Sequence, residues 1–322
     1  MKKMYGVNTP LSCPMKENGA VVGVRVAANE SYEIQHVIIE QTADIPLLQG
    51  SKYVQSHITP QLYESIEKIL LQGRKVLFSG CPCQVSGAKR RFRGYDNFLT
   101  VDIICHGVPS PLWWSRYIQW KKTQLGNASH LQIEFRNKSM GWSKFGIRIA
   151  AASGDVPQYR VMLTQDPFMR AFLRNDCLGL SCYLCPYASV IRPGDLSLGA
   201  YWGVKKYYPE LDEDDAGTSL VLVNNSRGQE LFEQLKSSSH LVATTRESAL
   251  PGNMVLGHAV EGSWARIHFY SDLKEHSFDN FIEKYHLCQS AESGNLFRKI
   301  LRRLSHAIST RVFRLWLRNK NA

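Results

Sequence analysis

The chain has 322 residues and is 44% hydrophobic, so it can form a core without disulfide bonds and is too apolar for a disordered protein. Its formal net charge of +11 lies mostly at one end, because eight basic and no acidic residues follow Asn295. The rest carries 31 basic and 28 acidic residues, which argues against a whole surface built for nucleic acid. No apolar run reaches the ~18 residues of a membrane span.

The first residues include two lysines but no apolar segment typical of a signal peptide, so we expect a cytoplasmic protein. Thiols stay reduced in that compartment. The cysteines are therefore candidates for metal binding, redox chemistry or core packing, and they stand at positions 13, 81, 83, 105, 177, 182, 185 and 288.

The first part of the chain alternates between strand and helix patterns. Short apolar runs predict strands, and proline near a first turn followed by helical spacing predicts helices. The predicted strands are residues 21–27, 33–40, 75–79 and 98–104, and the predicted helices are residues 59–71, 84–92 and 110–125.

Strand, helix and strand at residues 75–104 predict two parallel strands joined by a crossover. Cys81 and Cys83 follow the first strand, and Cys105 follows the second. The carboxyl ends of parallel strands share one edge, where open α/β sheets bind their ligands. We therefore expect these thiols at one site of an α/β fold with a mixed sheet.

The second part predicts a hairpin, further strands and a basic C-terminal amphipathic helix. The hairpin strands are residues 131–136 and 144–150, the later strands 196–202 and 219–223, and the helices 166–175 and 226–237. No clean linker precedes about Ser290, so we expect one domain, with an N-terminal part (1–94) and a C-terminal part that holds the Cys-x2-Cys segment (95–290), followed by the tail (291–322).

Cys182 and Cys185 form a Cys-x2-Cys pair, a spacing that lets two thiolates bind one metal centre. Cys177 extends it to Cys-x4-Cys-x2-Cys, but a nearby fourth cysteine is missing. Joining the pair to thiols from the strand ends can supply four thiolates, which suit either zinc or an iron–sulfur cluster. Cys13 and Cys288 are better explained as core or surface residues.

Several ordered segments resemble the coenzyme F-420 hydrogenase/dehydrogenase beta-subunit family of iron–sulfur flavoproteins. The resemblance spans about residues 4–251. The segments are LQGSKYVQS (48–56), VLFSGCPCQ (76–84), VDIICHGVPS (101–110), SCYLCP (181–186), RPGDLSLG (192–199) and YWG (201–203).

The resemblance implies a 4Fe–4S cluster held by four cysteines, with Cys81, at a usual threonine position, and Cys177 as spares. It also implies cofactor contacts near a flavin (FAD). The implied cluster ligands are Cys83, Cys105, Cys182 and Cys185, and the implied cofactor contacts are Ser51, Lys52, Tyr53 and Gln84. Without the family, Lys52 would be read as a solvated loop lysine.

The sequence departs from the family in three places. An N-terminal ferredoxin module is not expected here. The Ser-Gly-Gly helix start that supports the flavin is missing, because residues 11–19 run directly into the strand at Val21. Ala200 replaces the carboxylate of the Gly-Asp-x-Trp-Gly motif. The cluster ligands are thus retained while the flavin pocket is altered.

His106 is the one candidate for a catalytic group, since it follows Cys105 and histidine can tune a cluster or carry a proton. A turn histidine that only packs is the alternative. In the tail, apolar residues at helical spacing from Phe297 to Leu315 alternate with basic ones. This pattern fits an anionic membrane surface, a protein partner or packing on the body, with nucleic acid a poorer fit.

The sequence therefore predicts an oxidoreductase subunit that relays electrons through a 4Fe–4S cluster to a flavin or a substrate. A ferredoxin-like or other redox protein would be the donor. Relatives without coenzyme F-420 resemble proteins of surface-polysaccharide pathways, which suggests a role there. The alternative is a non-enzymatic structural or assembly protein, peripheral on the inner face of the membrane, that retains a cluster or zinc.

Overall fold

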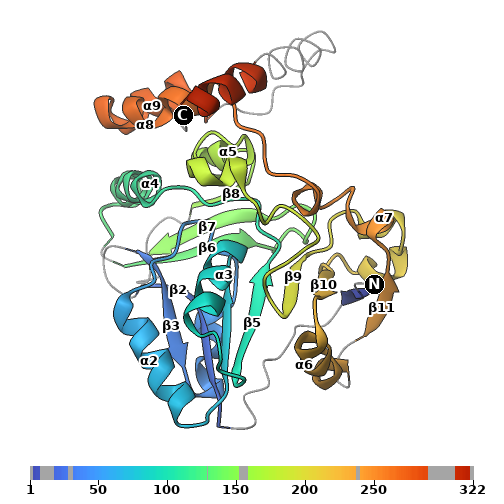
Figure 1. Ribbon diagram of the computed structural model, residues 1–322. Coiled ribbons are helices and arrows are strands. Elements are labelled where there is room, and N and C mark those ends of the chain that lie inside the picture. The colour runs from blue at the N-terminus through green and yellow to red at the C-terminus, as the bar shows by residue number, and fades with distance from the viewer. Residues whose placement is uncertain are drawn as a thin grey trace.

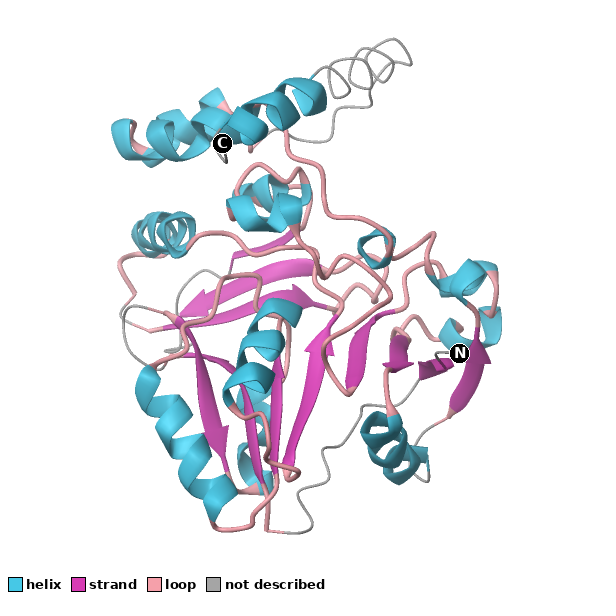
Figure 2. Cartoon of the chain, viewed as in Figure 1, coloured by secondary structure: helices cyan, strands magenta, loops and turns pink. Residues whose placement is uncertain are grey.

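A computed structural model describes residues 3–7, 18–27, 32–128, 130–151, 159–236, 240–288 and 309–319. The chain forms an eight-stranded mixed sheet and a three-stranded sheet, with helices around them (Figures 1 and 2). The large sheet has the order β11-β1-β10-β9-β5-β4-β2-β3. Its strands are β1 (Lys3–Val7), β2 (Ala20–Val26), β3 (Ile34–Ile39), β4 (Val76–Gly80), β5 (Phe98–Ile103), β9 (Leu196–Ala200), β10 (Ser219–Val223) and β11 (Leu241–Thr244).

The predicted parallel core is confirmed. β2, β4, β5 and β9 pair in parallel, and α3 (Pro82–Arg91) connects β4 to β5. α2 (Pro60–Leu71) and α3 bury apolar side chains against these strands, including Ile66, Val85 and Phe78. β3, β10, β1 and β11 add antiparallel strands on the two sides, so the class is α/β with a mixed sheet.

The predicted hairpin is also present and belongs to the small antiparallel sheet of β6 (Leu131–Asn137), β7 (Gly146–Ala151) and β8 (Tyr159–Met162). A layer of helices lies near it (Figure 1). These are α4 (Pro111–Gln124), α5 (Pro167–Leu173), α8 (Ala265–Glu275) and α9 (Phe278–Lys284). Trp113 is fully buried among their aromatic rings, which makes this layer one apolar core.

Local sequence explains where the helices begin. Thr59, Ser110 and Asp166 each accept a hydrogen bond from a backbone N–H of the helix they precede, and a proline occupies the first turn. The remaining elements are α1 (Ile45–Leu48), α6 (Ser226–Lys236), α7 (Arg246–Ala249) and the 3-10 turns Thr42–Asp44, Leu180–Leu184, Val204–Lys206, Pro209–Asp212 and Met254–Leu256.

Three strands and four helices were not predicted, and the helices are α1, α7, α8 and α9. β1, β8 and β11 are only four or five residues long, and the sequence between residues 238 and 289, which holds α8 and α9, lacks a clear helical stripe. The segment boundaries near residues 94 and 290 stay predictions. Within the described residues, no helix has the length and apolar character needed to cross a bilayer.

The tail is helical at residues 309–319 and packs on the body; its residues 291–308 lie outside the described part. Phe313 and Leu317 are buried, and the Phe313 ring meets Tyr183 edge-on at 4.7 Å between centroids. Leu315, which belongs to the predicted apolar stripe, is 62% exposed. The face that packs is therefore offset from that stripe, and it covers the segment that carries Cys182.

We expect Phe313→Ala to lower the free energy of unfolding by about 3 kcal/mol, because it leaves a cavity against Tyr183. Leu315→Ala, on the exposed side of the same helix, should change it by less than about 0.5 kcal/mol. Chemical denaturation measures both variants. Equal effects of the two substitutions would contradict the observed packing.

His36 on β3 is buried, and its ring stacks on Phe78. Its Nε2 lies 3.1 Å from the Ser79 carbonyl oxygen. Burial lowers its pKa from 6.5 to about 4. The unfolded chain therefore binds a proton that the folded chain does not between those pH values. Stability should fall by about 3 kcal/mol as the pH drops from 6.5 to 4 and should not change through this group above 6.5.

Urea unfolding across this pH range tests the effect. His36→Gln should flatten the acid limb of the profile, whereas His268→Gln, at an exposed position, should leave it intact. An unchanged acid limb in the His36 variant would assign the loss of stability to other groups.

Candidate functional site

Three thiols follow the carboxyl ends of β4 and β5. Cys81 and Cys83 begin α3 directly after β4, and Cys105 follows β5 after one intervening residue. Because β4 and β5 are parallel, both ends lie at the same edge of the sheet. The Sγ atoms of Cys81 and Cys105 are 3.8 Å apart and share a hydrogen bond. Topology thus joins thiols that are 24 residues apart.

A third segment brings the Cys-x2-Cys turn to the loop after β5. The Gly179 N–H donates to the Val108 carbonyl at 3.0 Å, and the Cys182 N–H donates to the Gly179 carbonyl at 3.0 Å. Gly107 has a φ of +142°, and a Cβ there would lie 2.8 Å from the Leu178 side chain and 3.5 Å from the Cβ of Cys182. The glycine of Cys-His-Gly therefore permits the close approach of this turn.

The four thiols predicted as ligands affect one another electrostatically. Cys83 is exposed as a residue, but partial desolvation of its thiol raises its pKa, and the charges on Cys105 and Cys185 raise it further. Burial raises the pKa of Cys182 to about 11, with added contributions from the other three thiols. The pKa of Cys105 is lowered instead, by its hydrogen bond with Cys81 and by the nearby charge of Arg192.

The remaining cysteines have different surroundings. Cys81, predicted as a spare, is the thiol in contact with Cys105. Cys177, the other spare, is fully buried in the apolar core, and its carbonyl accepts the Tyr270 hydroxyl. Cys288 is exposed, and Cys13 lies outside the described residues.

The spacing of these thiols bears on the metal they could hold. Among the described residues, no group of three or more His, Cys, Asp or Glu side chains is arranged around a single metal ion. Tetrahedral zinc brings its sulfur ligands to about 3.8 Å from one another. In a 4Fe–4S cluster each thiolate binds a different iron, so the sulfurs are more widely spaced. Four thiolates are a donor set that suits such a cluster and suits zinc as well.

A buried ion pair, which the sequence did not reveal, lies beneath the site. Arg192 Nε and Nη2 donate to Asp102 Oδ1 at 2.9 and 2.5 Å, and the Gly194 N–H donates to Oδ2 at 2.8 Å. Arg192 Nη2 also donates to the Ile103 carbonyl at 2.6 Å. The pair therefore fixes the end of β5, where Cys105 follows, to the turn before β9. The arginine of the RPGD segment was the available signal.

His106 lies beside the thiols with one tautomer fixed. Asn175 Nδ2 donates to the Glu261 carbonyl at 2.8 Å, so its Oδ1 accepts the Nε2–H of His106 at 2.7 Å. Burial lowers the pKa of His106, which favours the neutral ring with an unprotonated Nδ1. The ring packs on Phe172, whose other neighbour is Tyr53. His106 is thus oriented as a hydrogen-bond acceptor through Nδ1.

The predicted cofactor contacts are mostly engaged within the chain. Lys52 Nζ donates to the Leu48 and Gln49 carbonyls at 2.9 and 2.6 Å, and burial lowers the pKa of Lys52 to about 8. Gln84 accepts the Cys81 N–H at 2.9 Å and donates to the Ser56 hydroxyl at 2.9 Å.

Ser51 and Tyr53 are half-buried in the same loop. The polar groups of Lys52 and Gln84 hold this loop against α1 and α3, and their role as flavin contacts stays a prediction.

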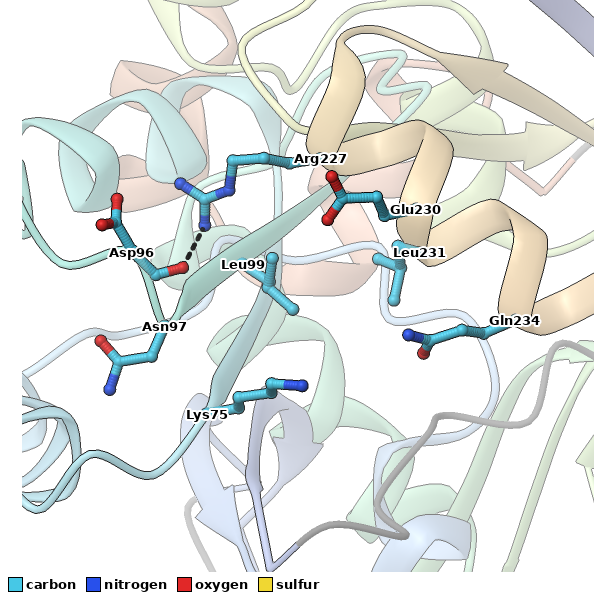
Figure 3. A pocket seen from close by; sticks show the side chains of 8 residues that line it. All are labelled: Lys75, Asp96, Asn97, Leu99, Arg227, Glu230, Leu231 and Gln234. Carbon is cyan, nitrogen blue, oxygen red and sulfur yellow. Dashed lines mark hydrogen bonds between the residues drawn. The ribbon is translucent and has the colours of Figure 1, made fainter.

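A cavity of about 310 Å³ lies at the opposite edge of the sheet, near the amino ends of β4 and β5 (Figure 3). Arg227 crosses it and donates to the Asp96 carbonyl at 3.2 Å. Its lining mixes both charge signs and comprises Lys75, Asp96, Asn97, Leu99, Arg227, Glu230, Leu231 and Gln234. Its position separates it from the thiols.

Comparison with known proteins identifies the family. The sequence profile for the C-terminal region of the coenzyme F420 hydrogenase/dehydrogenase beta subunit matches residues 73–248, which is more than half of the chain. This range includes the positions of all four predicted ligands. The chain belongs to this beta-subunit family. The predicted resemblance is thereby confirmed, and beta-subunit membership supports a redox role in general terms.

Other comparisons are less specific. Among solved structures, the chain is similar to one in the F-420-reducing nickel–iron hydrogenase complex of Methanosarcina barkeri, with 13% identity and a TM-score of 0.45. The match covers 88% of this chain and 90% of that chain. No curated protein matched significantly.

Proposed function

We propose that this beta-subunit-type protein is an iron–sulfur oxidoreductase subunit that relays electrons through a 4Fe–4S cluster. The observation that supports the proposal is the convergence of Cys83, Cys105, Cys182 and Cys185, from three segments, at the carboxyl edge of the parallel strands. Four thiolates are the usual ligand set of such a cluster. When bound, the cluster supplies one-electron transfer.

The chain's own residues prepare this edge for a cationic centre. The charge of Arg192 and the hydrogen bond with Cys81 favour the thiolate of Cys105. Desolvation, and after it the charges of the neighbouring thiolates, raise the pKa of Cys83 and of Cys182, and bound iron would relieve the repulsion among the thiolates. His106 follows Cys105 in the chain, and its unprotonated Nδ1 can accept a proton from a substrate.

The proposed donor is a ferredoxin-like or other redox protein. Cys83 is exposed, as are the apolar side chains of Leu184 and Ile191 around the Cys-x2-Cys turn. Such a surface suits transient docking, because exposed apolar side chains promote protein contact. The link to surface-polysaccharide synthesis rests on the resemblance alone.

Anaerobic purification with iron, zinc and flavin measured on one sample tests the proposal. We expect about four irons per chain and a visible absorption that reduced ferredoxin bleaches. Colourless, iron-free protein after anaerobic reconstitution would overturn it. One zinc per chain would favour the alternative of a structural or assembly protein. The hydrogen bonds that Lys52 and Gln84 form within the chain also favour this alternative.

A further inference from the structure

A second polar site lies on the small sheet, around Arg136 at the end of β6. The β6–β7 register shifts between Glu134 and Asn137, so Arg136 sits in an irregular stretch of the strand. The centre of its guanidinium lies 4.5 Å from the Phe145 ring, 5.0 Å from the Trp202 ring and 5.5 Å from the Trp142 ring.

The aromatic rings do not satisfy the N–H groups of this guanidinium. Ring faces attract the cation, but a guanidinium directs its N–H groups outward within its own plane. Arg136 Nε and Nη2 are both buried, and neither has a hydrogen-bond partner among the described residues. Buried N–H groups without an acceptor are rare in folded proteins, because their desolvation is uncompensated.

Arg192 of the same chain shows what these two atoms normally bind. Its Nε and Nη2 together grip one carboxylate, that of Asp102, so they form one edge of the guanidinium. Arg136 presents the equivalent edge, and no ion pair of Arg136 is formed within the described part of the chain. A group that accepts from both N–H donors of this edge at once has the chemistry of a carboxylate or a phosphate.

The surroundings of Arg136 are cationic on one side. Lys138 lies two residues further along, and the charge of Arg136, after burial, lowers the pKa of Lys138. The negative charge of Asp212 partly offsets this lowering of the Lys138 pKa. Asp212 also pairs with Lys205, whose Nζ lies 3.5 Å from its carboxylate. Lys138 Nζ itself donates to the Ala216 carbonyl at 3.0 Å.

The guanidinium lies near the surface of the protein, since the adjoining side chains of Tyr53 and Trp202 are each half-buried. Tyr53 also faces the guanidinium, and the two side chains interact electrostatically. Trp202 stacks on Trp142 at 4.5 Å between centroids, which gives the site an apolar wall. An oxyanion attached to an apolar or ring-bearing molecule would meet both surfaces.

We propose that the Nε/Nη2 edge of Arg136 binds the carboxylate or phosphate group of a small-molecule ligand, with the Trp142, Phe145 and Trp202 rings holding the guanidinium in place. This site is independent of the thiols and of any cluster. Arg136 is thus a binding residue, and its buried Nε–H and Nη2–H groups lower the free energy of unfolding of the ligand-free protein.

Thermal unfolding with inorganic phosphate or acetate, each exchanged against chloride at constant ionic strength, tests the proposal. We expect at least one of the two anions to raise the melting temperature of the wild type. Arg136→Met should weaken the apparent affinity about tenfold or more, and its anion-free melting temperature should equal or exceed that of the wild type. Arg136→Lys, which keeps the charge without the two-pronged edge, should lose most of the response.

Arg160→Met, at an exposed position of β8, is the matched control and should respond as the wild type does. NMR of protein labelled at arginine nitrogen gives a second readout, in which the Arg136 Nε–H signal should shift on addition of the anion. A wild type that responds to neither anion would overturn the proposal. So would an Arg136→Met variant with an unchanged response, which would leave the arginine a packing residue.

Discussion

Replacing Asp102 by alanine should lower the free energy of unfolding by about 3–5 kcal/mol, because it leaves the guanidinium of Arg192 buried and unpaired. The two side chains are 0% and 1% exposed, so water cannot take the place of the lost carboxylate. The backbone N–H of Gly194 also loses its acceptor. Urea denaturation of the metal-free protein measures the change.

The matched control is Glu67→Ala, which breaks the pair between Glu67 and Arg91 on the surface of α2 and α3. There the side chains are 28% and 52% exposed, and the expected loss is below about 1 kcal/mol. A double variant, Asp102→Leu with Arg192→Met, should recover much of the stability lost in Asp102→Ala, since neither charge then stays buried alone. Similar losses for Asp102→Ala and Glu67→Ala would refute the argument.

The same pair connects stability to the thiols. Arg192 lowers the pKa of Cys105 through its charge, so a variant without the arginine should have a less acidic Cys105 thiol. The double variant therefore separates the two roles of the pair: it restores folding but not the electrostatic support of Cys105.

The sequence predicted the parts of the fold that depend on strong local patterns. The strand–helix–strand unit at residues 75–104 combined short apolar runs with helical spacing, and topology then required Cys83 and Cys105 to share an edge. β1 and β11 were not predicted, because such short strands are defined by pairing with strands distant in the sequence and not by a local pattern.

The candidate site was predictable for its thiols and not for what surrounds them. Cysteine spacing and order indicate thiol ligands, but spacing alone does not reveal that Cys81 lies 3.8 Å from Cys105. The hydrogen bonds of Lys52 with the carbonyls at the end of α1 depend on the folded conformation of the loop after that helix. The burial of Arg136 among three aromatic rings joins β6 to the segment after β9, which no local pattern connects.

Substitution of any one of the four proposed ligands by serine should remove most of the iron from anaerobically purified protein. Serine keeps the size of the side chain but binds iron less well than a thiolate, because soft sulfur suits these clusters. Iron content and visible absorption of the Cys83→Ser, Cys105→Ser, Cys182→Ser and Cys185→Ser variants measure the loss. Unfolding temperatures of the metal-free variants show whether each still folds.

Cys81→Ser is the most informative control, because Cys81 lies in the same turn as Cys83 and its sulfur is in contact with that of Cys105. We expect it to retain its iron, as should Cys177→Ala in the core and Cys288→Ser at the surface. If Cys81→Ser loses iron while Cys83→Ser keeps it, Cys81 is the ligand and the assignment from the family motif is wrong at this position.

The outcome at these two positions also reports on which of the two thiols the start of α3 favours as a thiolate. Cys83 belongs to the first turn of α3, where backbone N–H groups lower its pKa against the effects of burial and neighbouring thiolates. Cys81 precedes the helix, and the pKa of its thiol is raised well above the usual value by its hydrogen bond with Cys105 and by burial. The helix thus favours a thiolate at Cys83 over one at Cys81, which is why we expect iron binding to depend on Cys83.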